Sequence, residues 1–330
     1  MLQLQDQKRT DVQFSLSKEE EETGRDLWNE YLHRKRTSGG KGPFGSPELL
    51  IPDEVGSLEE KRKTLLGILT RALQAAMHPM LSAISDDEAS AFDEDLAENL
   101  VDSMDLDDGK NAIIDTVLEI LELKGNIGQV AEVPSTKKTI TEEEWRERIE
   151  KDGNALKSSR VHVFLKLYDT LRREFPEERI VVFSVYRHFL DIIEQALKLH
   201  NPKARPLRYD DTKTTDQREF VRKEFEQQRY DQILLITAGA GGVGLNLTSA
   251  SIVIQTEVWW NHRRELQAYA RAHRKGQSKT VKVYRLMAKN SLVDGHIKKH
   301  QRIKTKVIDK FAQVLVRADN EPPVIPFPII

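Results

Sequence analysis

The 330-residue sequence contains no cysteine. This absence excludes disulfide bonds, thiolate catalysis and every zinc site built on cysteine ligands, and it is typical of an intracellular protein. The sequence also lacks a run of about eighteen apolar residues, the length that a membrane span requires, and residues 1–11 contain no apolar signal core. With 38% hydrophobic residues, we expect a soluble globular protein with no membrane partner.

A phosphate-binding loop of the form G-x-x-x-x-G-K-[S/T] is missing as well. The glycine-rich segment 37–43 lies next to a lysine, but its spacing is wrong and no strand precedes it, so we interpret it as a linker. No acidic box at the end of a hydrophobic strand is present to bind Mg²⁺. Alone, the chain is therefore not expected to hydrolyse a nucleoside triphosphate.

Charge is distributed very unevenly along the chain. Residues 1–150 hold 18 Lys and Arg against 33 Asp and Glu, and residues 86–108 alone carry 11 acidic side chains and no basic one. Residues 259–310, in contrast, hold 15 basic and only 3 acidic residues. This asymmetry favours an anionic partner for the C-terminal half, although a solvated helix face is the alternative interpretation.

The acidic half is expected to be mainly helical. VQFSLS, residues 12–17, is strand-like, and Ser17 is a plausible N-cap for a helix that continues to about residue 36. Apolar spacing predicts further helices at 58–77 and 111–123, with 86–108 as a flexible or inserted acidic segment and a polar stretch up to about 158. We therefore expect residues 1–158 to form a helical connecting region.

From Ser159 onwards, short hydrophobic runs alternate with amphipathic segments. The predicted strands are 180–184, 206–209, 232–236, 251–255 and 280–285, and the predicted helices are 161–173, 189–199, 215–228 and 262–273. This alternation predicts an α/β fold with a doubly wound parallel sheet over 159–290, followed by a tail at 291–330. Ligands of such sheets usually bind at the carboxyl ends of the strands.

A glycine-rich turn follows the predicted strand 232–236. Gly239, Gly241 and Gly244 match G-x-G-x-x-G, and Glu257 lies where a dinucleotide-binding fold would place its ribose-binding acid. However, only about six residues separate Gly244 from the next strand, too few for a parallel crossover helix. A dinucleotide-dependent oxidoreductase is therefore only a remote alternative. A turn whose backbone N–H groups approach phosphate, with Thr237 and Asn246 beside it, fits better.

Gln267, Arg271 and Arg274 are spaced i, i+4, i+7, which would place them on one face of the predicted helix 262–273. Two converging guanidinium groups repel each other unless an anion lies between them, and a polyphosphate fits because each guanidinium can bind oxygens in a bidentate manner. This spacing therefore predicts arginine-finger chemistry at a transferred phosphoryl group.

The segment 267–277, Q-A-Y-A-R-A-H-R-K-G-Q, resembles motif six of the Swi/Snf-type ATPases, a group of superfamily-two helicases. Segments 234–248, 258–261 and 179–184 resemble motif five, the aromatic stretch after it and motif four. Residues 66–79 resemble the helix after the first lobe, and 291–304 the closing brace helix. The similarity points most to the DNA-repair translocase branch, but the absence of cysteine excludes that branch's RING insert.

The resemblance implies a RecA-like C-terminal helicase lobe. Carried over by position, Arg271 and Arg274 would be catalytic, while Gln267, Gly242 and Gly244 would bind ATP. Ser184, Thr237 and Asn246 would lie on the DNA side. ATP with Mg²⁺ would be bound mainly by an N-terminal RecA-like lobe absent from this chain and supplied in cis or in trans. Duplex DNA or chromatin would be the other partner and the nucleus the location. A non-catalytic DNA- or chromatin-binding module derived from such an enzyme is the main alternative.

Overall fold

The computed structural model describes residues 6–37, 71–81, 142–210, 212–227, 232–240, 245–259, 261–299, 301–302 and 305. The predicted helix at 111–123 and the acidic segment 86–108 lie outside these residues, and the predicted helix at 58–77 is described only from residue 71, where it is helical to residue 77. Among the described residues, no helix combines the length and apolar character that a membrane crossing needs.

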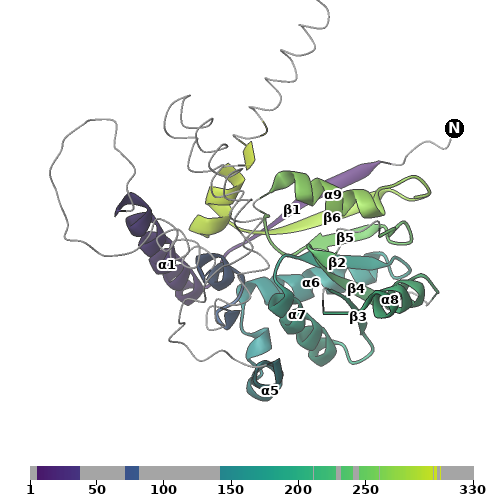
Figure 1. Ribbon diagram of the computed structural model, residues 1–330, viewed down its shortest axis with the longest axis horizontal. Coiled ribbons are helices and arrows are strands. Elements are labelled where there is room, and N and C mark those ends of the chain that lie inside the picture. Colours follow the sequence, from purple (N-terminus) through teal and green to yellow (C-terminus); the bar gives the residue numbers. More distant parts are fainter. Residues whose placement is uncertain are drawn as a thin grey trace, which may run out of the picture.

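One six-stranded sheet, parallel throughout, organises the described chain (Figure 1). Its strands lie in the order β1-β6-β5-β2-β4-β3. The strands are β1 (Gln7–Phe14), β2 (Ile180–Ser184), β3 (Arg205–Tyr209), β4 (Gln232–Thr237), β5 (Ile252–Gln255) and β6 (Val281–Ala288). The predicted α/β fold with a RecA-like parallel sheet is confirmed.

Helices cover both faces of this sheet, as expected for parallel strands that are apolar on both sides. They are α1 (Lys18–Thr37), α5 (Glu142–Asp152), α6 (Ser159–Glu174), α7 (Arg187–His200), α8 (Thr215–Gln227) and α9 (His262–Ala272), with a short 3-10 turn at Asn154–Leu156. In β2, Ile180 and Val182 pack with α5, α6 and α7, whereas Val181 and Phe183 pack with α8 and α9. The two-residue period of the strand thus assigns alternate side chains to two separate cores.

The strand β1 departs from the expected domain division. It pairs with β6 along its whole length, from Gln7 opposite Val281 to Phe14 opposite Ala288. Asp11 reinforces this pairing through an ion pair with Arg285 at 2.8 Å. The parallel sheet therefore includes a strand from the region 1–158, and the expected boundary at residue 158 does not coincide with the limit of the sheet.

The N-terminus of α1 is capped as the sequence predicts. The Ser17 hydroxyl accepts a hydrogen bond from the Glu20 amide at 3.3 Å, and the Glu20 carboxylate accepts one from the Ser17 amide at 2.8 Å. These reciprocal bonds form a capping box. The same carboxylate also accepts a bond from the Ser159 amide at 2.9 Å, at the first residue of α6. Glu20 therefore joins the N-termini of two helices.

Helix α5 lies within the stretch that the sequence suggested was merely polar. Trp145 and Ile149, four residues apart, are 1% and 3% exposed and pack into the core beneath α6 and α7. The Trp145 indole donates a hydrogen bond to Asp191 at 3.1 Å, which satisfies its polar atom. Only two apolar side chains in an otherwise charged helix were enough to fix its position.

Candidate functional site

Helix α9 carries the residues that the sequence marks most strongly. It begins after Asn261, whose side chain accepts a hydrogen bond from the Arg263 amide at 3.0 Å. Ala268, Tyr269 and Ala272 are buried against the sheet, which leaves Gln267 exposed and Arg271 half-buried. The apolar stripe of α9 therefore fixes the direction in which Gln267 and Arg271 project.

Arg274 does not lie on this helix. The helix ends at Ala272, and His273 donates its amide to the Tyr269 carbonyl at 2.9 Å as the C-cap. A turn follows in which the Gln277 amide bonds to the Arg274 carbonyl at 3.0 Å. Gly276, with a φ of 105°, is the third residue of that turn and occupies a conformation that favours glycine. The prediction of one helical face for all three residues is thus wrong for Arg274.

The two arginines nevertheless influence each other electrostatically. Burial and the neighbouring positive charge of Arg274 both lower the pKa of Arg271, with only a weak opposing effect from Tyr209. Within the described part of the chain, neither guanidinium has a carboxylate as a hydrogen-bond or ion-pair partner. Two neighbouring cations without a counter-ion are suited to binding an anion that carries more than one charge.

The segment after α9 is bound directly to the segment that follows β4. The Leu247 amide donates to the Arg271 carbonyl at 3.0 Å. The Gln277 side-chain amide, which is buried, donates to the carbonyls of Thr248, Ala250 and Ala272 at 3.1, 2.8 and 3.2 Å. Movement of residues 246–250 is thereby coupled to the backbone beside the two arginines.

The position of the arginine pair within the sheet differs from the general expectation. Helix α9 starts after the carboxyl end of β5 and runs back towards the amino end of β6. Ala250, bound by Gln277, lies two residues before β5 begins. The pair therefore lies near the amino ends of β5 and β6, and not at the carboxyl ends where the ligands of such sheets usually bind.

The remaining predicted site residues are distributed over two regions. Asn246 is exposed, and its side chain accepts a hydrogen bond from the Thr248 amide at 3.2 Å, close to the arginine pair. Thr237 lies at the carboxyl end of β4 and is 5% exposed. Gly242 and Gly244 lie outside the described residues, as does Gly241.

Ser184 does not lie where a residue that contacts DNA is expected. It ends β2, is completely buried, and donates its hydroxyl to Glu257 at 3.1 Å while accepting the Tyr186 amide at 3.1 Å. A hydroxyl that is buried and hydrogen-bonded in this way cannot contact a DNA phosphate directly. Ser184 instead supports the turn between β2 and α7.

Glu257, the acid on which a dinucleotide-binding interpretation depended, is also enclosed. Besides Ser184, its carboxylate accepts hydrogen bonds from the Val185 amide at 2.7 Å, the Trp259 indole at 2.8 Å and the Thr256 hydroxyl. Burial raises the pKa of Glu257 despite these donors. With its oxygens satisfied within the protein, Glu257 is not positioned to bind a ribose.

A buried carboxylate at the start of α9 was not singled out from the sequence. Glu265 accepts hydrogen bonds from the Gln255 side chain at 2.8 Å, the Trp259 amide at 2.9 Å and Arg285 at 3.1 Å, and lies 2.9 Å from His262. It was visible only as one of the three acidic residues in a strongly basic region. Glu265 anchors α9 to β5 and β6, and so fixes the position of the helix that carries Arg271.

The region that contains these residues is similar in sequence to known proteins. The helicase conserved C-terminal domain matches residues 159–276, a range that includes every site residue predicted from the sequence. The DNA repair protein RAD5 of Cryptococcus neoformans is 40% identical to the chain over 153 residues. Residues 159–276 are therefore a helicase C-terminal domain, which supports the resemblance to the Swi/Snf-type ATPases. The two arginines thus lie at the end of this domain.

The extent of similarity is limited to a part of each relative. The RAD5 alignment covers 46% of this chain and 12% of the relative, and an uncharacterized ATP-dependent helicase of Mycoplasma genitalium is 40% identical over 126 residues, covering 38% and 12%. The chain thus spans about one eighth of these relatives' length. The C-terminal part of the Fun30 ATPase domain superposes with a TM-score of 0.55 at 20% identity, covering 90% of both chains, which shows a shared fold around the helicase C-terminal domain.

Proposed function

We propose that this chain acts as the second lobe of an ATP-dependent DNA translocase of the DNA-repair or chromatin-remodelling type, working with a separate RecA-like first lobe. The observation that supports this most directly is the pair Arg271 and Arg274, close together and without a carboxylate partner among the described residues. Their location in a helicase C-terminal domain supports a role as arginine fingers.

In this proposal, ATP with Mg²⁺ is held mainly by the first lobe and supplies the phosphoryl group that is transferred to water. Arg271 and Arg274 donate hydrogen bonds to its terminal phosphate oxygens and stabilise the charge that develops there, which in comparable enzymes accelerates the reaction about 10³-fold to 10⁵-fold. Gln267, exposed on the same helix as Arg271, together with Gly242 and Gly244, completes the nucleotide side of the lobe.

We assign DNA contacts to Thr237, at the carboxyl end of β4, and to Asn246, in the segment beside the arginine pair, and a nuclear location follows if the chain works as its RAD5 relatives' name, DNA repair protein, suggests. The hydrogen bonds from Leu247 to Arg271 and from Gln277 to Thr248 and Ala250 connect the segment that contains Asn246 to the arginine pair. A shift of residues 246–250 on DNA would therefore be transmitted to the two arginines, and vice versa.

The test is DNA-stimulated ATP hydrolysis by the 330-residue chain, with and without an added first-lobe ATPase domain. We expect no hydrolysis by the chain alone and hydrolysis with the added lobe. Arg271→Ala and Arg274→Ala should each lower kcat by about 10³-fold, with little change in the affinity for ATP. Arg263→Ala is the matched control, since Arg263 is an exposed arginine on the same helix.

Two other experimental results would each indicate a function different from the proposed one. Salt-sensitive DNA binding with no hydrolysis under any pairing would indicate a non-catalytic DNA- or chromatin-binding module. Quenching or enhancement of NADH fluorescence on titration would revive the dinucleotide-binding interpretation, against which the enclosed Glu257 speaks. Activity that is unaffected by both arginine substitutions would reject the proposed roles of Arg271 and Arg274.

A further inference from the structure

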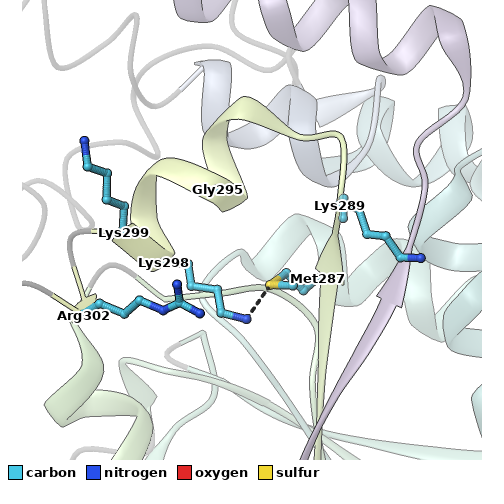
Figure 2. A pocket seen from close by; sticks show the side chains of 7 residues that line it. Met287, Lys289, Gly295, Lys298, Lys299 and Arg302 are labelled. Carbon is cyan, nitrogen blue, oxygen red and sulfur yellow. Dashed lines mark hydrogen bonds between the residues drawn. The ribbon is translucent and has the colours of Figure 1, made fainter.

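A groove at the opposite edge of the sheet from the arginine pair is lined by basic residues. It has a volume of about 320 Å³ and lies between the carboxyl end of β6 and the helical residues 292–299 and 301–302. Its lining residues are Met287, Ala288, Lys289, Gly295, Lys298, Lys299 and Arg302 (Figure 2). Four of these seven residues carry a positive charge, and none is acidic.

Two carboxylates close to the groove, Asp294 and Asp11, are already paired with cations. Asp294 forms a buried ion pair with Arg160 at 3.0 Å and also accepts the Ala288 amide at 2.8 Å. Asp11 pairs with Arg285 at 2.8 Å and with Lys298 at 2.7 Å. Lysine 298 is thus the only groove cation with an ion-pair partner among the described residues. Lys289, Lys299 and Arg302 are exposed and have no such partner there.

The arrangement of the side chains suits an extended anion better than a small one. Lys298 is held against the floor of the groove, with its ammonium group 3.3 Å from the Met287 sulfur, and the Arg302 side chain lies beside it (Figure 2). Lys299 and Lys289 project away from this centre in different directions. One anion of atomic size cannot touch cations spread in this way, whereas a chain of linked anions can.

We propose that this groove binds successive phosphate groups of a nucleic-acid backbone, with Lys299 and Arg302 as principal contacts and Lys289 at its margin. The proposal rests on the proposed function, because it takes nucleic acid as the partner of this lobe. The groove lies at the carboxyl ends of β6 and β1, the same edge as Thr237 at the end of β4. The arginine pair lies near the opposite edge, so the two cationic sites serve different phosphates.

The proposal is tested with a fluorescently labelled DNA duplex whose binding to the full chain is followed by anisotropy between 50 and 300 mM salt, concentrations of the order used to separate phosphate contacts. The Lys299→Glu/Arg302→Glu variant should lower the affinity at least about tenfold and reduce the slope of log K against log salt by about 2, because each phosphate contact contributes about 0.9. The Lys299→Gln/Arg302→Gln variant should show a smaller loss in the same direction.

The matched control is Arg173→Glu/Lys203→Glu, which reverses two exposed charges without an ion-pair partner among the described residues. These residues lie where α6 and α7 return to the amino ends of β2 and β3, far from the groove. An equal loss of affinity and slope in the control and the groove variant would overturn the proposal, because it would show a general charge effect. Thermal melting of every variant distinguishes a loss of contacts from unfolding.

The experiments can reject the proposal about the groove and the proposed function independently of each other. We expect Arg271→Ala/Arg274→Ala to bind the duplex with unchanged affinity while losing the hydrolysis measured with an added first lobe. Normal duplex binding by the groove variants, together with arginine-dependent hydrolysis, would reject the groove alone. A wild-type chain that does not bind the duplex at all would reject both.

Discussion

The guanidinium of Arg160 and the carboxylate of Asp294 form an ion pair at 3.0 Å in which the side chains are 0% and 5% exposed. Arg160, at the start of α6, also donates to the carbonyls of Ala76 at 3.1 Å and Thr256 at 2.9 Å. Asp294 lies on the helix after β6. Arg160, which lies within the helicase C-terminal domain, therefore links Ala76 before that domain to Asp294 after it.

Removing either partner of this pair should destabilise the chain. Arg160→Met leaves Asp294 as a buried charge without a counter-ion, and Asp294→Asn does the same to Arg160, so each should lower the free energy of unfolding by about 3–5 kcal/mol. The double variant should lose much less than the sum of the two. Urea denaturation of the four proteins gives this comparison, and strictly additive losses would show that the pair contributes nothing specific.

Replacing the side-chain amide of Gln277 with a carboxylate should destabilise the protein. Its side-chain amide donates to three backbone carbonyls, those of Thr248, Ala250 and Ala272, and Gln277→Glu would replace this donor with a negatively charged acceptor. We expect Gln277→Glu to be more destabilising than Gln277→Ala, which should cost about 1–3 kcal/mol. Chemical denaturation measures both. A Glu variant as stable as the Ala variant would mean that the amide is not essential there.

Glu265 should make stability depend on pH in the acidic range. Burial alone would raise the pKa of Glu265, but hydrogen bonds from His262 and Gln255 and the charge of Arg285 hold it below the ordinary value of 4.5. A carboxyl whose pKa is lower in the folded state stabilises that state above about pH 4.5, and the stabilisation disappears as the pH falls through the folded-state pKa.

The Glu265→Gln variant should therefore be less stable than the wild type at pH 7, by about 1–3 kcal/mol, and the difference should shrink as the pH falls below the ordinary pKa of 4.5 and through the lower folded-state pKa. Urea midpoints measured at several pH values follow this difference. Glu150→Gln is the control, since Glu150 is exposed on α5 and should give no difference at any pH. A difference in stability between the wild type and Glu265→Gln that stays constant with pH would contradict the assigned role of the Glu265 charge.

Trp145 should be essential for the stability of the domain although it lies outside the matched range 159–276. It is 1% exposed beneath α6 and α7, so Trp145→Ala should lower the free energy of unfolding by about 3–5 kcal/mol. Leu156→Ala, at a 40% exposed leucine nearby, should change it by less than about 0.5 kcal/mol. Equal effects of the two substitutions would show that α5 is not part of the core.

The sequence predicted the regular part of this architecture well. The five strands β2 to β6 and the helices α6 to α9 follow from strong two-residue or helical periodicity, and their ends agree to within a few residues. The pairing of β1 could not be predicted, because its alternation is weak and its partner β6 lies more than 260 residues away. Helix α5 was missed because a charged helix with two apolar residues has little periodicity.

The sequence predicted which residues form the candidate site better than it predicted how they are arranged. Arg271 and Arg274 were found from their spacing, but the helix ends between them at the C-cap His273, so Arg274 lies in the turn that contains Gly276 and not on the helix. The burial of Ser184 and Glu257 depends on contacts between residues about 70 positions apart. No local pattern in a single sequence reveals such contacts.

The pairing of β1 with β6 also dictates an order of events during synthesis. Residues 7–14 leave the ribosome long before residues 281–288, their neighbour in the described sheet, have been made. Until then the four strands β2 to β5 can assemble, but Asp11 lacks its partners Arg285 and Lys298. β1 is thus translated before the other strands of this sheet but can dock only once β6 exists, and a chain stalled before residue 281 would leave β1 unpaired and available to associate with other polypeptides.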